Sequence, residues 1–167
     1  RYPKRLLNIL EPPKQLYVRG NVSLLNKPSI AIVGSRNCTE YGYKQAIKFS
    51  KELSDKGICV ISGMAIGIDT AAHVGANGSH KYVTLSRTAT FSRKLSMFFK
   101  YHINSLLEEG GYSILEEEGC IITEFPPEKE VDLSNFPRRN RIIAGISMGV
   151  LLIEGRLRSG SVVTAHH

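Results

Sequence analysis

Cysteine is scarce in this sequence, and long apolar runs and a secretory leader are missing from it. The three cysteines, Cys38, Cys59 and Cys120, are widely spaced and form no CxxC pair, which argues against a metal site or a disulfide framework. No apolar run reaches the roughly 18 residues of a membrane-spanning helix. The short apolar patch near the start is soon broken by Pro12 and Pro13, unlike a signal peptide. We therefore expect a cytoplasmic protein with reduced thiols, no metal and no membrane partner.

Acidic residues are missing from residues 70–107, whereas five lysines and arginines lie between residues 81 and 100. Eight glutamates follow within residues 108–130, and five arginines follow between residues 138 and 158. The formal net charge is +7. Such segregation is typical of a face that binds a polyanion, although solvated surface charge explains it equally well.

The apolar runs that are present are short, and each ends in a turn. Runs over residues 30–33, 59–61, 120–123 and 150–153 have the length and composition of buried parallel strands, and residues 81–85 are a candidate for another. Residues 43–56 predict an amphipathic helix, and a second helix opens near residue 70. This alternation predicts an α/β fold, Rossmann-like and doubly wound, with a mostly parallel sheet and helices on both faces.

Two units are expected within the 167 residues. Residues 1–28 form an N-terminal lead-in segment with a short helix and a short strand at residues 16–20. Residues 29–167 form the Rossmann-like domain. Because the sequence starts at Arg1 and ends where a helix should follow Thr164, we expect a domain that is truncated at its C-terminus.

Four motifs follow the predicted strands, and ligands of doubly wound sheets bind at those strand ends. The first is Gly34-Ser35-Arg36, where a glycine allows close backbone approach and an arginine can hold phosphate through two hydrogen bonds. A tight turn with an exposed arginine is the alternative. The dinucleotide fingerprint GxGxxG is absent here, which argues against an ordinary dehydrogenase.

The second motif is the glycine turn that contains Ser62, Gly63 and Gly67. Asp69 or Thr70 is expected to cap the helix that follows it. A pairing of Asp69 with the histidine one helical turn later could serve catalysis, but no nucleophile or metal ligand accompanies it, so a structural role is favoured.

The third motif, at residues 136–145, carries Arg138, Arg139 and Arg141 around Asn140. These arginines repel one another unless they are solvated or face an anion. Phe136 could stack on a base or pack in the core. The fourth motif is Ser159-Gly160-Ser161, which suits phosphate, a helix start or a flexible loop.

Taken together, IAIVGSR at residues 30–36, VISGMAIGIDTAAH at residues 60–73, IITEFPP at residues 121–127, FPRRNRIIAGIS at residues 136–147 and SGSVVTA at residues 159–165 resemble the DprA/Smf (DNA processing protein A) family. The resemblance covers about residues 2–77 and 119–165. It implies a DNA-binding protein and not an enzyme, with no cofactor, whose partners are single-stranded DNA, a RecA-type recombinase and a second copy in the full-length protein. Its role would be DNA recombination during natural transformation, the uptake of DNA by competent cells.

The residues that this resemblance and the motifs assign to DNA binding are Gly34, Ser35, Arg36, Ser62, Gly63, Gly67, Arg138, Arg139, Asn140, Arg141, Ser159, Gly160 and Ser161.

Residues 81–118 depart from the family pattern, because the expected glycine turn and tyrosine-proline segment are missing there. The alternative function is a nucleotide-processing enzyme of the related lysine-decarboxylase-like group. That group carries a PGGxGTxxE motif, which this sequence lacks.

Overall fold

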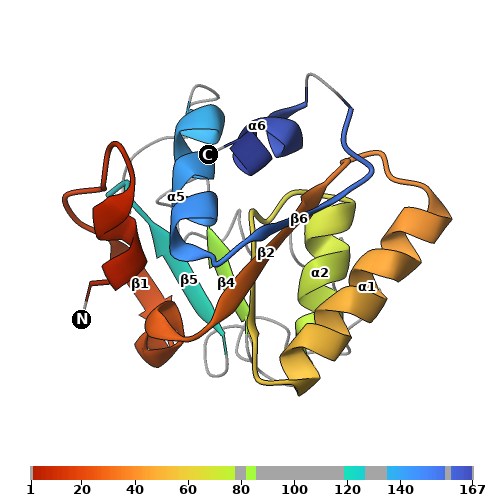
Figure 1. The fold of residues 1–167 in the computed structure, drawn as a ribbon, viewed down its shortest axis with the longest axis horizontal. Coiled ribbons are helices and arrows are strands. Elements are labelled where there is room, and N and C mark those ends of the chain that lie inside the picture. Colours follow the sequence, from red (N-terminus) through yellow and green to blue (C-terminus); the bar gives the residue numbers. More distant parts are fainter. Residues whose placement is uncertain (1, 78–81, 86–118, 127–134, 157–158, 167) are drawn as a thin grey trace.

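A six-stranded sheet forms the centre of the protein in a computed structural model that describes residues 2–77, 82–85, 119–126, 135–156 and 159–166 (Figure 1). The strand order is β1-β5-β4-β3-β2-β6. All neighbouring strands run parallel except β1, which pairs antiparallel with β5. The strands are β1 (Tyr17–Gly20), β2 (Ser29–Gly34), β3 (Cys59–Ser62), β4 (Tyr82–Leu85), β5 (Cys120–Thr123) and β6 (Val150–Ile153).

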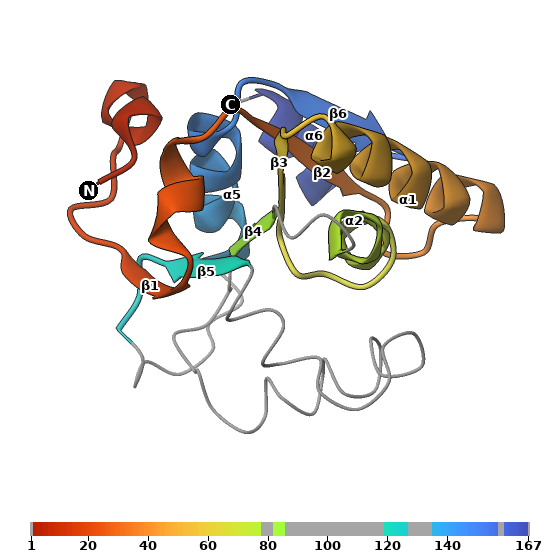
Figure 2. The same ribbon diagram turned by 90° about the horizontal axis from the view of Figure 1, so that it is seen from below.

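Helices cover both faces of this sheet, as the two views show (Figures 1 and 2). One face packs against α1 (Glu40–Asp55) and α2 (Ile68–Asn77), and the other against α5 (Asn135–Ile146) and the 3-10 helices η1 (Lys4–Asn8) and η2 (Val22–Asn26). The side chains of β2 alternate accordingly. Ile32 packs on the α1 and α2 side, whereas Ala31 and Val33 pack on the α5 side.

Small residues let α1 and α2 approach each other closely. A Cβ atom at Gly75 would lie 2.3 Å from the Ile47 carbonyl oxygen, so only glycine fits there. On the same interface the Ser50 hydroxyl donates to the Ala72 carbonyl, and the Ser54 hydroxyl donates to that of Ala76. These contacts fix the two helices against each other beneath the ends of β2 and β3.

The N-terminal residues pack onto the sheet and onto α5. β1 extends the sheet at one edge through its pairing with β5. Leu6 is fully buried against the α5 side of the core, and Ile9 fills the space where a Cβ atom at Gly145 would lie. Residues 2–28 therefore complete one face of the core.

The predicted fold class is confirmed, and so are the strands expected at residues 30–33, 59–61, 120–123 and 150–153. The predicted start of α2 was wrong. This helix begins at Ile68, so Asp69 and Thr70 lie within its first turn and neither is its N-cap. A short helix, α6 (Gly160–His166), begins within the fourth motif and contains Thr164, so the expectation that a helix follows Thr164 was wrong. Most of the divergent segment at residues 81–118 lies outside the described residues.

The described part of the chain has neither a membrane-spanning helix nor a cluster of metal ligands. Nowhere in it is a helix both long enough and apolar enough to cross a bilayer. Nor do three histidine, cysteine or carboxylate side chains of that part come together as metal ligands would.

The strand order places β2 between β3 and β6. The chain moves from β2 to β3 on one side and returns to β6 on the other, so the loops that follow β2 and β6 diverge. In doubly wound sheets the crevice at such a switch point is where ligands bind.

Candidate functional site

A cleft of about 740 Å³ opens at this switch point, beyond the carboxyl ends of β2 and β6. Four segments far apart in sequence form its walls: the loop after β2, the loop after β3, the middle of α5, and the segment from β6 to α6. The lining residues are Val33, Gly34, Ser35, Arg36, Asn37, Ala65, Asp69, Arg139, Asn140, Ile143, Glu154, Arg156, Ser159, Gly160, Ser161 and Thr164.

The loop after β2 presents a hydroxyl and a guanidinium to the cleft. The Ser35 amide donates to the Ile153 carbonyl at 3.3 Å, and its hydroxyl oxygen accepts from the Asn37 amide at 3.1 Å. The Ser35 hydroxyl can still donate its own proton, because a hydroxyl has one donor and two acceptor positions. Arg36 is exposed at the mouth.

Gly34 serves the packing of strands rather than the approach of a ligand. A Cβ atom at this position would lie 2.0 Å from the Ile153 carbonyl oxygen and 2.7 Å from the Ile68 side chain. The space next to Gly34 is therefore filled by the protein itself, which is a different reason for glycine from the one that the sequence predicted.

Gly67 holds the loop after β3 against the loop after β2. Its φ is +81°, and a Cβ atom would lie 2.3 Å from the Ser35 carbonyl oxygen. The Ile68 amide donates to that same carbonyl at 3.2 Å. Only glycine combines this backbone conformation with this proximity, so Gly67 fixes the backbone that carries Arg36.

A buried acidic group lies under the floor of the cleft. The Asp69 carboxylate accepts from the amides of Gly63 and Ala65 at 3.1 and 3.2 Å, and Arg139 donates to the Gly63 carbonyl. Burial raises the pKa of Asp69, and the nearby Arg139 guanidinium opposes that rise. A Cβ atom at Gly63 would lie 2.7 Å from the Arg139 side chain and 2.9 Å from that of Asp69. Glycine at residue 63 therefore leaves space for these two side chains.

Two residues near this group lie away from the cleft surface. The buried Ser62 hydroxyl donates to the Ile32 carbonyl at 2.7 Å and ties β3 to β2. His73, one turn after Asp69, is also buried, and burial lowers its pKa to about 4. His73 is therefore neutral near pH 7, as expected of a structural histidine.

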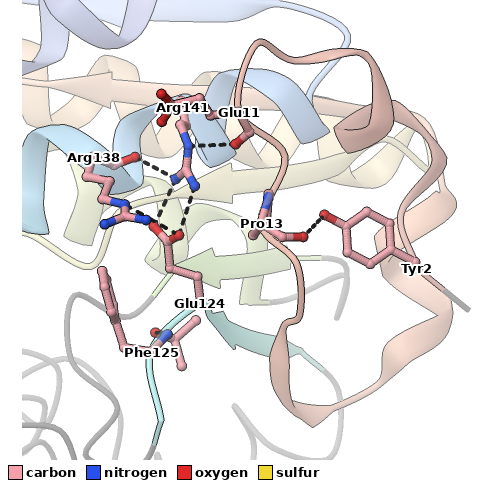
Figure 3. A network of polar contacts seen from close by, with 8 residues as sticks. Tyr2, Glu11, Pro13, Glu124, Phe125, Arg138 and Arg141 are labelled. Atoms are coloured by element: carbon pink, nitrogen blue, oxygen red, sulfur yellow. Dashed lines mark hydrogen bonds and ion pairs between the residues drawn. The ribbon is translucent and has the colours of Figure 1, made fainter.

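The arginines of the third motif have three different environments. Arg139 is buried beside Asp69, whereas Arg141 forms a two-pronged ion pair with Glu124, with both N–O distances at 2.8 Å (Figure 3). Arg141 also donates to the Glu11 carbonyl at 2.9 Å, which links α5 to the lead-in segment. Arg138 is mostly exposed and lies 3.7 Å from the same Glu124 carboxylate.

The third and fourth motifs meet through Asn140. Its side-chain amide donates to the Gly160 carbonyl at 3.1 Å, and the Thr164 hydroxyl donates to the same carbonyl at 3.0 Å. The hydroxyls of Ser159 and Ser161 lie 2.8 Å apart on the cleft wall. These contacts place small polar groups opposite Arg36.

The structure thus divides the residues predicted from sequence into two sets. Eight line the cleft: Gly34, Ser35, Arg36, Arg139, Asn140, Ser159, Gly160 and Ser161. The other five, Ser62, Gly63, Gly67, Arg138 and Arg141, lie behind or beside it. The side chain of Phe136, a candidate for base stacking, lies outside the described residues.

Sequence reasoning missed Glu154, Arg156 and Asn37 as lining residues. Glu154 has a φ of +53°, uncommon for a residue other than glycine. Its carboxylate accepts from the Thr39 amide at 2.7 Å and from the Thr39 hydroxyl. The Thr39 hydroxyl and amide lower the pKa of Glu154. The feature of the sequence that could have identified Glu154 is its place directly after a predicted buried strand and before Gly155.

The mouth of the cleft carries donors that suit an anion. Both of its carboxylates are engaged by the protein, Asp69 by backbone amides near Arg139 and Glu154 by Thr39. Arg36 and Arg156 are exposed at the mouth, and serine hydroxyls lie beside them. Guanidinium and hydroxyl donors around a recess are suited to phosphate oxygens.

One family model and several curated relatives match nearly the whole chain. The family model described as DNA recombination-mediator protein A matches residues 1–167. Protein Smf of Escherichia coli is 38% identical over 98% of this chain and 42% of its own length. DNA processing protein DprA of Streptococcus pneumoniae is 35% identical over 98% of this chain and 54% of its own length. The chain therefore spans about half the length of these relatives.

Two solved structures share the fold. The X-ray structure of DprA from Streptococcus pneumoniae matches with a TM-score of 0.81 at 33% identity, over 99% of this chain and 55% of that one. DprA from Helicobacter pylori, whose structure describes a single-stranded DNA binding mode, matches with a TM-score of 0.80 at 26% identity, over 99% of this chain and 72% of that one.

Proposed function

Because the chain belongs to the DprA/Smf family of DNA recombination mediators, we propose that it binds single-stranded DNA in the cleft at the carboxyl ends of β2 and β6. Arg36 and Arg156 bind backbone phosphates, and the hydroxyls of Ser35, Ser159 and Ser161 add neutral donors. The protein acts in the cytoplasm, without catalysis, a cofactor or a metal.

One observation carries this proposal: two exposed arginines line a cleft together with the hydroxyls of Ser35, Ser159 and Ser161. An arginine can hold a phosphate through two charge-assisted hydrogen bonds. The exposed Arg36 and Arg156 line the cleft, whereas the Arg141 guanidinium lies outside it and is bound to Glu124. The phosphate contacts therefore centre on the cleft mouth and not on the arginine-rich start of α5.

The remaining predicted residues position this surface in the proposal. Gly67 and Gly63 shape the loop after β3, and Asn140 and Gly160 join α5 to α6. Arg139 lines the cleft and holds the loop after β3 through the Gly63 carbonyl. Arg138, which is exposed beside the cleft, is available to a strand that leaves it.

A recess favours a single strand over a duplex. A flexible strand can direct a phosphate or an unstacked base into a hollow, whereas a duplex presents a stiff outer surface. A cleft of about 740 Å³ also falls within the size range of small-ligand pockets. The decisive experiment must therefore compare DNA with a free nucleotide.

Fluorescence anisotropy of a labelled single-stranded oligonucleotide makes that comparison. We expect binding that is competed by unlabelled single strand, weakly competed by duplex and not competed by ATP. The logarithm of affinity should fall by about 0.7 for each phosphate contact per tenfold rise in salt. Competition by ATP at concentrations that match the oligonucleotide, with a flat salt response, would overturn the proposal in favour of a small-molecule site.

Loading of a RecA-type recombinase and formation of a homodimer are proposed for the full-length protein, since this chain covers only part of its relatives. We expect the full-length protein to accelerate recombinase filament assembly on single strands coated with a single-strand-binding protein. We also expect the 167-residue chain to self-associate weakly. A tight dimer of this chain at micromolar concentration in sedimentation would contradict the second expectation.

A further inference from the structure

Glu154 occupies the position where a doubly wound fold ordinarily binds a phosphate. In such folds the helix after the strand at the switch point directs its N-terminal amides toward a phosphate group. Here that strand is β2 and that helix is α1. The carboxylate at its N-terminus belongs to the chain itself: Glu154 accepts from the Thr39 amide at 2.7 Å and from the Thr39 hydroxyl.

A second feature shows that this position is built to hold the carboxylate. A Cβ atom at Gly42, in the first turn of α1, would lie 2.4 Å from the carboxyl carbon of Glu154 and 2.5 and 2.8 Å from its oxygens. Glycine at residue 42 therefore leaves the space that Glu154 fills. The Gly42 amide donates to the Thr39 hydroxyl at 3.1 Å, so Thr39 connects the helix start to the carboxylate.

The backbone of Glu154 adds a third observation. Its φ of +53° lies in the left-handed region, which residues with a side chain adopt at a cost. Met64 is the other described non-glycine residue with positive φ. Glu154 adopts this conformation directly after β6, where its carboxylate contacts the N-cap residue of α1, Thr39.

We propose that Glu154 is a specificity-determining residue that closes the helix N-terminus of α1 to free phosphates and nucleotides. Its carboxylate fills the space and repels a second anion. Phosphates are consequently bound at the mouth of the cleft by Arg36 and Arg156, where a continuous strand can enter and leave. A terminal phosphate of a mononucleotide finds the helix N-terminus already occupied. This inference does not depend on DNA being the ligand.

The test uses inorganic phosphate as the probe and thermal unfolding as the readout. Glu154→Gly removes the carboxylate and suits the positive φ. We expect this variant to melt below the parent and to regain melting temperature as phosphate rises through the millimolar range, because a ligand of the folded state stabilises it. The parent should show a smaller rise, because Glu154 occupies its helix N-terminus and leaves phosphate the arginines at the mouth. Glu40→Gln is the control. It removes a carboxylate from the first turn of α1 but leaves Glu154 in place.

Two outcomes would overturn the proposal: the folded variant fails to respond to phosphate, or the parent responds as strongly as the variant. If Glu154→Gly does not fold, Glu154→Asn decides, because asparagine tolerates left-handed backbone and carries no charge. The parent offers a further check by NMR. Its Thr39 amide should titrate with a carboxyl group whose pKa lies below that of an ordinary glutamate, and phosphate at pH 7 should leave that amide unshifted.

The oligonucleotide titration described above remains separate from this test. A parent that excludes phosphate but fails to bind single-stranded DNA would refute the proposed function and leave the role of Glu154 intact.

Discussion

Two groups of arginines lie near the carboxyl edge of the sheet, and the structure uses them differently. At β5 and α5, Arg141 and Glu124 form an ion pair whose side chains are 11% and 7% exposed, and Arg139 is buried beside Asp69. At β2 and β6, Arg36 and Arg156 are exposed around a cleft. The group that is denser in sequence is thus largely bound within the protein. Burial and the pairing of Arg141 with Glu124, which the density of arginine in the sequence does not show, thus distinguish the α5 group.

The largest expected effect on stability is at Arg139. Replacing it with alanine leaves the Asp69 carboxylate buried without its neighbouring positive charge, and removing one member of a buried charged pair costs about 3–5 kcal/mol. The free energy of unfolding, measured by urea denaturation, should fall by about that amount. Arg138→Ala is the matched control, because the Arg138 side chain is 60% exposed and its loss should change stability by about 0.5 kcal/mol or less. Equal losses in both variants would remove the distinction between the two arginines.

Glu124→Gln tests the second ion pair. It removes one partner from two charge-assisted hydrogen bonds of 2.8 Å, and bonds of this kind contribute about 1.5–3 kcal/mol. We expect a loss of that size in the free energy of unfolding, with little change in DNA affinity for the molecules that remain folded. Glu40→Gln breaks the exposed pair between Glu40 and Lys44 and should cost about 0.3–0.5 kcal/mol. A large loss of DNA affinity in Glu124→Gln would assign the α5 arginines to the binding surface after all.

Gly67→Ala connects stability with binding on the cleft side. Alanine at a φ of +81°, against the Ser35 carbonyl, forces the two loops apart. We expect a loss of about 1–3 kcal/mol in unfolding free energy and weaker binding of single-stranded DNA, because Arg36 moves with its loop. Gly149→Ala is the control, since its Cβ atom meets its nearest neighbour at an ordinary 3.6 Å. If Gly67→Ala is destabilised but keeps the DNA affinity of the parent, the contact between the loops after β2 and β3 is not required for DNA binding.

The smallest effect concerns pH. The pKa of Glu154 is lowered by its bonds to Thr39, so the folded state binds its proton less readily than the unfolded state does. The stability from this contact is present above the ordinary glutamate pKa and is lost as pH falls through the lowered value. Between about pH 5 and pH 3 the melting temperature of the parent should therefore fall more steeply than that of Glu154→Gln. Parallel curves would show that the carboxylate makes no such contact in solution.

Much of the fold was accessible from sequence because buried strands have a strong apolar signal. The runs that became β2, β3, β5 and β6 were predicted within one residue at either end. The starts of α1 and α2 were less accurate. Thr39 is the N-cap that begins α1 before Tyr43, and the Gly67 turn begins α2 at Ile68. Capping and turn geometry depend on a few atoms, so periodicity alone does not fix them.

The site was predicted less completely, for a physical reason. Strand-end motifs located the loop of Arg36 and the serines near α6, since parallel strands bring their carboxyl ends together. Whether an arginine faces a ligand or a carboxylate depends on a partner distant in sequence, as Glu124 is from Arg141. The same holds for Glu154, whose contact with Thr39 spans 115 residues. Sequence reasoning had no access to either pairing.

The most direct test of DNA binding at the switch point compares Arg36→Ala with Arg19→Ala in a titration with one labelled single strand. The two variants have the same net charge, but Arg19 lies on β1, at the sheet edge opposite β6. Loss of charge-assisted phosphate bonds predicts about ten- to hundredfold weaker binding for Arg36→Ala and near-parental affinity for Arg19→Ala. If Arg36→Ala binds as the parent does, or if both variants lose affinity equally, DNA does not bind at this cleft.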